Sequence, residues 1–132
     1  MSILEKLERD ENSPQYVEQW LGYYLLFLDG REIDAIKYSL NSYTTFPDNS
    51  SGLFNAACGY AQLYKIELDE VGAKEILTSQ NRLESLRLLR QAIRVESGLK
   101  ALARKHPDEG DSFESLEDDV EFLRITEPRT SA

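Results

Sequence analysis

The sequence has little of what most active sites and membrane segments require: among its 132 residues are one cysteine, one histidine and no long apolar run. A single cysteine cannot form an internal disulfide, so Cys58 fits a reducing compartment, and we expect a cytoplasmic protein. No apolar stretch approaches the roughly 20 residues of a membrane span. The first residues lack the charged-then-apolar order of a signal peptide. We therefore expect no membrane partner.

The scarce reactive side chains do not form a recognisable catalytic or metal-binding set. His106 stands beside Pro107 in a predicted loop, and no cysteine or carboxylate is spaced to complete a metal site with it. Cys58 lies in a run of small residues, which is typical of a packed thiol, and no base can be assigned to it. The acidic residues of 108–111 lack the spacing of a calcium loop. We expect no enzyme, metal or cofactor. An enzyme with scattered catalytic residues stays an alternative, which a deep pocket with converging polar groups would favour.

Positive charge is also scarce, with 15 Lys and Arg against 24 Asp and Glu and a net charge of −9. Nucleic-acid binding requires clustered basic residues, so we expect no nucleic-acid partner. The charge is uneven: residues 82–106 hold seven basic residues against two acidic ones, and residues 107–132 hold nine acidic against two basic. The basic helix pairs with the acidic tail within one fold, or it offers a basic face to an acidic partner, or its charges are solvated surface with no role.

The residues that are present in quantity indicate one all-helical domain. Apolar residues form 41% of the chain, enough for a single core at this length. The chain is organised around the stretch 53–64, in which Leu53, Ala57, Tyr60 and Tyr64 recur at helical spacing. Small residues between them let neighbouring helices approach closely. The spacing therefore predicts a helix that packs between two others.

Two helices are expected before this stretch. Ser13 and Pro14 predict a helix start, and the helix should run to about Asp29, with Gly30 as its C-cap. A turn this short predicts an antiparallel second helix over about 32–45. The first helix carries apolar residues around most of its circumference, so it is either buried on several sides or leaves an apolar strip open to a partner.

The expected elements after Tyr64 are shorter. Residues 65–80 read as an irregular piece with a short helix from Asp69 to Leu77. Asn81 should cap a helix through Val95 whose apolar side carries Leu83, Leu86, Leu89 and Ile93. A short helix should follow Ser97. Ser115 with Asp118 should cap a last one with Leu116, Val120 and Leu123 on its face.

Several residues stand at spacings that resemble the tetratricopeptide repeat family, which repeats antiparallel helix pairs every 34 residues. Trp20 stands at the usual large aromatic position. Asn55-Ala56-Ala57-Cys58-Gly59-Tyr60-Ala61 is similar to a run common in bacterial repeats. The turn glycine, two small packing residues and the closing proline of the first repeat correspond to Gly30, Ala35, Ser42 and Pro47.

The resemblance implies an all-α fold of stacked antiparallel helix pairs, with about two repeats plus terminal capping helices. The expected parts are a short N-terminal helix (1–12), a first repeat (13–49), a second repeat (50–96) with an insertion at about 65–80, capping helices (97–126) and a flexible tail (127–132). The segment 99–123 resembles the one that often closes such arrays, with Val120 in place of its usual proline.

The resemblance also implies a peptide-binding groove along the first helix of each pair. In the second repeat its positions are Phe54, Asn55, Cys58 and Gln62. In the first repeat they are Glu18, Leu21 and Leu25. Asn55 either bonds a peptide backbone or bonds a neighbouring helix end. The family's clamp for a C-terminal carboxylate is absent apart from Asn55, so we do not expect chaperone-tail binding.

Together these observations predict a non-catalytic protein–protein interaction module, an adaptor or assembly factor, with a protein or peptide partner in the groove. The alternative is a structural homodimer. The aromatic residues of the first helix either fill the core, or Trp20, Tyr23, Tyr24 and Phe27 overfill it and some stay exposed. An exposed patch of that kind would be a partner site, or in the homodimer a self-association face.

Overall fold

A computed structural model describes residues 14–28, 30–45, 50–104 and 112–128. The expected N-terminal helix (1–12), Pro47, His106 and most of the C-terminal tail lie outside these ranges. The described residues are helical and contain no strand. They form α2 (Pro14–Leu25), α3 (Glu32–Thr45), α4 (Ser50–Val71), α5 (Gln80–Val95), α6 (Leu99–Arg104), the 3-10 turn η1 (Glu114–Leu116) and α7 (Val120–Ile125). Across these ranges no helix combines the length and apolarity needed to cross a membrane.

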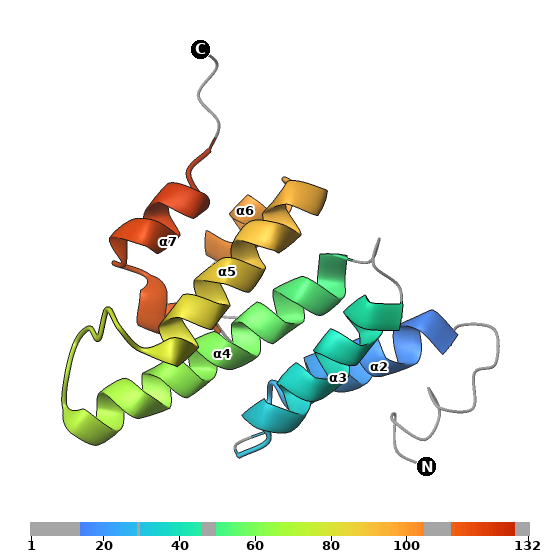
Figure 1. The fold of residues 1–132 in the computed structure, drawn as a ribbon, viewed down its shortest axis with the longest axis horizontal. Helices are drawn as coiled ribbons and strands as arrows, with labels where there is room; N and C mark the ends of the chain where they lie inside the picture. Colours follow the sequence, from blue (N-terminus) through green and yellow to red (C-terminus); the bar gives the residue numbers. More distant parts are fainter. Residues whose placement is uncertain (1–13, 29, 46–49, 105–111, 129–132) are drawn as a thin grey trace.

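The helices α2, α3, α4 and α5 run antiparallel in succession, and α4 lies between α3 and α5 (Figure 1). The start of α4 meets the end of α5 where the Ser50 hydroxyl donates to Glu96 at 2.9 Å. Further along, the Ser85 hydroxyl donates to the carbonyl of Ala57 at 2.8 Å. The predicted helix packed between two others is therefore confirmed, with Leu53, Ala57 and Tyr64 buried and Tyr60 partly buried.

The turn between α2 and α3 contains the predicted glycine, although Gly30 does not cap α2. Gly30 adopts a left-handed conformation with φ of 83°, which glycine reaches without steric cost. The predicted end of the first helix at Asp29 is wrong, because α2 ends at Leu25. The next three amides bond three residues back instead of four, at 3.1–3.2 Å, which tightens the chain into a turn.

Small residues bring α2, α3 and α4 into close contact around Ser39. A Cβ atom on Gly52 would lie 2.7 Å from the Ser39 carbonyl oxygen, and one on Gly22 would collide with the Ser39 hydroxyl. A Cβ on Gly59 would lie 2.5 Å from Cγ1 of Ile36. The glycines therefore permit a helix separation that any larger residue would prevent.

The predicted break after Tyr64 is wrong: α4 continues without interruption to Val71. Leu68 extends the buried face by one more turn after Tyr64. The helix ends at Gly72, which has φ of 68°, and the Ala73 amide bonds back to the carbonyl of Leu68 at 3.1 Å. This is the usual glycine-terminated helix end, so only residues 72–79 form the connection.

The start of α5 also differs from the prediction. Ser79, and not Asn81, is the N-cap, since its hydroxyl accepts a hydrogen bond from the Arg82 amide at 3.3 Å. The predicted apolar side is partly confirmed, because Leu86 and Leu89 are buried but Leu83 is exposed. Leu88, which the prediction omitted, is also buried.

The C-terminal elements close the core on the side of α4 and α5 away from α2 (Figure 1). Asp119 caps α7 by accepting from the amides of Glu121 and Phe122, so the predicted cap by Ser115 and Asp118 is wrong. The predicted face is also corrected. Leu116 and Phe122 are buried, whereas Val120 and Leu123 are exposed. The 3-10 turn separates Leu116 from α7, which removes it from the helical register of Val120 and Leu123.

Candidate functional site

The predicted groove on α4 is covered by the chain's own C-terminal segment. Phe54 and Asn55 are 9% and 6% exposed, and Cys58 is buried beside them. The ring of Phe54 packs edge-on against Phe113, with centroids 5.6 Å apart. The half-buried Gln62 side chain donates to the Ser112 hydroxyl at 2.8 Å. Phe54 and Gln62 therefore lie beneath residues 112–116, and Asn55 and Cys58 are buried, so these four sequence-predicted residues do not line an open surface.

Further contacts hold the covering segment in place. The Ser115 hydroxyl donates to the carbonyl of Ala61 on α4 at 2.9 Å. Phe113 also stacks against Phe122 of α7, with centroids 5.5 Å apart, and Leu116 is fully buried. A peptide bound at Phe54 and Gln62 would have to replace these contacts.

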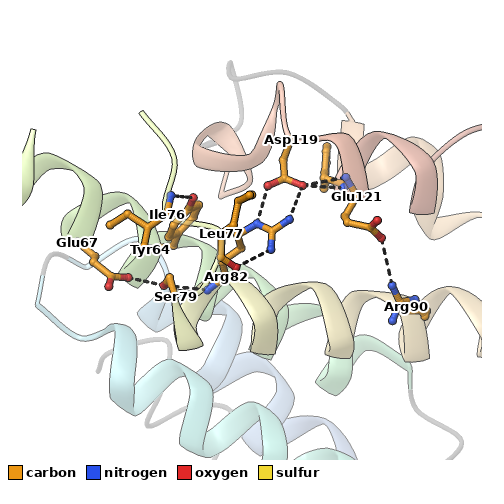
Figure 2. A network of polar contacts seen from close by, with 10 residues as sticks. Tyr64, Glu67, Ile76, Leu77, Ser79, Arg82, Arg90, Asp119 and Glu121 are labelled. Atoms are coloured by element: carbon orange, nitrogen blue, oxygen red, sulfur yellow. Dashed lines mark hydrogen bonds and ion pairs between the residues drawn. The ribbon is translucent and has the colours of Figure 1, made fainter. Parts of the chain in front are cut away.

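A buried ion pair fixes the end of this segment to α5 (Figure 2). The Arg82 guanidinium donates from Nε to Oδ2 of Asp119 at 2.7 Å and from Nη2 to Oδ1 at 3.2 Å. Burial alone would raise the pKa of Asp119. The hydrogen bonds from Arg82 and from the α7 amides outweigh that effect and hold the pKa below its ordinary value. The hydrogen bond to Asp119 in turn raises the pKa of Arg82. The pair is therefore ionised at neutral pH and acts as a structural clasp.

The same region ties down the connection between α4 and α5. Arg82 also donates from Nη1 to the carbonyl of Leu77 at 3.0 Å. The Tyr64 hydroxyl accepts from the amide of Ile76 at 2.9 Å, and the Ser79 hydroxyl donates to Glu67 (Figure 2). These polar groups bond to one another, so they hold the connection in place.

The basic residues of α5 pair partly with the acidic segment that follows. Besides the buried clasp, Arg90 lies 3.6 Å from Glu121 at the surface (Figure 2). Arg87 pairs with Glu84 of its own helix at 2.7 Å, which lowers the pKa of Glu84. The pairing of basic helix with acidic tail inside one fold therefore accounts for Arg82 and Arg90.

An open cleft of about 480 Å³ lies between the end of α4, the 72–79 connection and the η1 segment. Its floor carries Tyr64 and Leu68, and its rim carries carboxylates of Glu75, Glu114 and Asp118 with the ammonium of Lys74. Among the described residues, no three His, Cys, Asp or Glu side chains are placed to hold a metal ion together.

The exposed side of α2 and the turn that follows it carry a row of aromatic side chains, which we call the aromatic strip: Trp20, Tyr23 and Tyr24 on the helix and Phe27 in the turn. They are 46%, 45%, 41% and 52% exposed. Trp20 meets Tyr23 edge-on at 5.9 Å, and Tyr23 meets Phe27 edge-on at 5.1 Å. Edge-to-face contacts at these separations are favourable, so the rings support one another while half of each stays open to solvent. Of the two alternatives for these residues, core filling and partial exposure, the structure shows partial exposure.

Leu21 and Leu25, predicted in the groove of the first repeat, face inward instead. They are 8% and 3% exposed and belong to the core, and Glu18 is half-buried on their side of α2. The helical period places these residues roughly 100–160° around the helix from Trp20. The prediction that these residues line a groove is wrong, because α3 packs against the side of α2 that the prediction had assigned to a partner.

No protein-family model, no curated protein and no solved structure matches this chain. The similarity to tetratricopeptide repeats therefore stays a prediction from the residues quoted above, and any assignment of function depends on the geometry of the fold.

Proposed function

We propose that this chain is a non-catalytic protein–protein interaction module, an adaptor or assembly factor, whose docking surface is the aromatic strip of α2. The observation that carries the proposal is four neighbouring aromatic side chains, each between 41% and 52% exposed, three of them on α2 and Phe27 in the turn that follows it. Aromatic residues are enriched, and charged ones depleted, at the centres of protein interfaces.

The composition of α2 supports this proposal. In a chain with 30% charged residues, 14–28 contain one, Glu18, and it lies on the inward side of the helix. Leu28 adds a partly exposed aliphatic side chain beside Phe27. Tyr and Trp bury large areas and keep a polar group for the rim of an interface. Such a surface suits docking of a protein face better than binding of a charged small molecule.

The remaining helices serve as the scaffold in this proposal. The antiparallel order of α2, α3, α4 and α5 suits two stacked helix pairs of the tetratricopeptide kind, with α6, η1 and α7 as the cap. Because residues 112–116 cover Phe54 and Gln62, the strip replaces the α4 groove as the docking surface. Peptide binding at Phe54, Asn55 and Gln62 would require the clasp of Arg82 and Asp119 to open.

Site-specific photo-crosslinking in the source cells tests the proposal. A benzophenone amino acid at position 27 should capture a polypeptide partner, and the Trp20→Glu change should abolish that capture. The same probe at position 102 is the control, because Leu102 of α6 is 47% exposed and lies away from the strip. Capture from position 62 but not from position 27 would move the docking surface back to the groove.

A further inference from the structure

We infer that the occupant of the aromatic strip is a second copy of this chain, held by antiparallel pairing of two α2 helices around a two-fold axis. This inference rests on the proposed function and names the partner at the same surface. Three features of the structure support it: the order of the rings along the strip, the area that they leave exposed, and the distribution of charge.

The order of the rings suits a two-fold interface, in which each residue's contact is repeated by its counterpart. The strip has an aromatic ring at each end, Trp20 and Phe27, and two between them. An antiparallel copy centred between Tyr23 and Tyr24 places Trp20 of each chain opposite Phe27 of the other. Both ends then find an aromatic partner, and the edge-on geometry already present within one strip can continue across the axis.

The exposed area approaches the lower limit for a specific dimer without exceeding it. Aromatic side chains present roughly 150–250 Å² each, so exposed fractions near one half leave roughly 400 Å² on one strip. Two strips therefore offer roughly 800 Å² of aromatic surface. Leu28 and the polar rim bring the total close to the roughly 1,200 Å² at which stable interfaces begin. We accordingly expect a reversible dimer with an affinity in the micromolar range.

The charge distribution permits two copies to meet at the side of the molecule that carries α2. Residues 107–132 carry nine acidic against two basic residues, whereas residues 14–45 carry four acidic against two basic, so most of the net charge of −9 lies elsewhere in the sequence. In the fold, α7 and α2 stand on opposite sides of the α4–α5 pair (Figure 1). Pairing through α2 therefore keeps the two acidic segments apart, and added salt should strengthen the dimer by screening the repulsion that remains.

Sedimentation equilibrium of the full chain tests the inference, over roughly 1 to 500 µM, a range that brackets micromolar affinity. We expect the average mass to rise from monomer to dimer. Trp20→Glu with Phe27→Glu should weaken association at least about 100-fold, because four carboxylates would then share one desolvated interface. Leu102→Glu, at a similarly exposed position, should leave it unchanged. Circular dichroism of each variant establishes that the helices are retained.

Engineered disulfides test the antiparallel geometry independently of affinity. Chains with Trp20→Cys and chains with Phe27→Cys, distinguished by mass tags, are mixed and oxidised. The native Cys58 is buried and should not compete. Mixed 20–27 dimers should form several-fold faster than 20–20 or 27–27 dimers. Equal rates, or a preference for identical pairs, would overturn the antiparallel arrangement.

Failure of this inference can be told apart from failure of the proposed function. A chain that stays monomeric at every concentration, or a dimer that survives the two glutamate substitutions, overturns the second copy as the occupant. If position 27 then still crosslinks a different protein, and Trp20→Glu abolishes that capture, the docking surface stands and its partner is foreign. If position 27 captures no polypeptide at all, the proposed function itself is wrong.

Discussion

Arg82 of α5 and Asp119 at the start of α7 form a two-point ion pair that solvent barely reaches, with side chains 7% and 4% exposed. The same carboxylate caps α7 through two backbone amides. One aspartate therefore holds the covering segment over α4 and also starts the last helix. Removal of either partner leaves a buried charge without compensation, which costs more than the pair contributes when intact.

Asp119→Ala should accordingly lower the free energy of unfolding by about 3–5 kcal/mol, because Arg82 stays buried and the cap is lost. Urea denaturation followed by circular dichroism measures the change. Asp34→Ala is the matched control, since Asp34 pairs with Arg31 at the surface and should cost less than about 1 kcal/mol. Equal losses for the two substitutions would contradict a clasp at Asp119.

The pH dependence of stability should contain a contribution from the same carboxylate. Its pKa is lower in the folded state than its ordinary value of 3.8. The folded state therefore gains stability that is fully present above about pH 4 and is lost as the pH falls through the lowered value. Wild-type chain and Asp119→Asn should differ most in urea midpoint at neutral pH and converge below pH 4. A constant difference between them down to about pH 2 would show that the charge is not responsible.

Sequence patterns predicted the bounds of α3, which begins after a local turn signal. They did not predict the end of α4, which is decided by tertiary contacts. Gly30 marked the turn before α3, and the bounds of α3 agree with the prediction. Asp69 and Glu70 look like a helix start, yet burial of Leu68 under the next elements carries α4 past them to Gly72. The glycine there was a readable signal, because glycine commonly follows a helix end.

The candidate site could be predicted from the sequence only in part, because only some of its features depend on local sequence patterns. The exposed aromatic strip was one of two outcomes that the composition and period of α2 allowed, because a helix apolar on most of its circumference is either buried on several sides or leaves a strip open. The cover over Phe54 and Gln62 could not be predicted in this way, because Ser112 and Phe113 precede a 3-10 turn with no helical period. They contact residues 50 or more positions earlier in the chain, and the segment that follows them is held by an ion pair between residues 37 positions apart, which no local pattern in the sequence encodes.

The close packing at Ser39 predicts a strong effect from a single methyl group. Gly52→Ala would place Cβ 2.7 Å from the Ser39 carbonyl oxygen, and a backbone atom of a packed helix cannot move aside cheaply. The substitution should destabilise the fold by about 1–3 kcal/mol, despite the better helix propensity of alanine. Thermal unfolding measures the loss. Gly98→Ala, where a Cβ meets nothing within 4 Å, should be nearly neutral, and a comparable loss there would refute the packing argument.

The cover over α4 should be removable by truncation of one ring. Phe113→Ala deletes the contacts with both Phe54 and Phe122 and should cost about 3–5 kcal/mol. The apolar surface of α4 around Phe54, which Phe113 covers in the wild-type chain, should then bind a hydrophobic dye that the wild-type chain does not bind. Val120→Ala provides the comparison, because that side chain is exposed and its loss should change neither stability nor dye binding by much. Unchanged dye binding in Phe113→Ala would mean that other residues still cover this surface of α4.

Trp20 is the only tryptophan in the chain, so its fluorescence reports on the aromatic strip alone. At low concentration the half-exposed indole should emit near the wavelength of solvated tryptophan and be quenched readily by iodide. Association through the strip removes water from the ring, so the emission should shift to shorter wavelength and quenching should fall as concentration rises. The midpoint of this change should coincide with the midpoint of the mass change, and Phe27→Glu should abolish both while Leu102→Glu alters neither. If the mass doubles while the emission stays constant, the copies meet through a different face, because no interface that includes the strip can leave the Trp20 ring as wet as before.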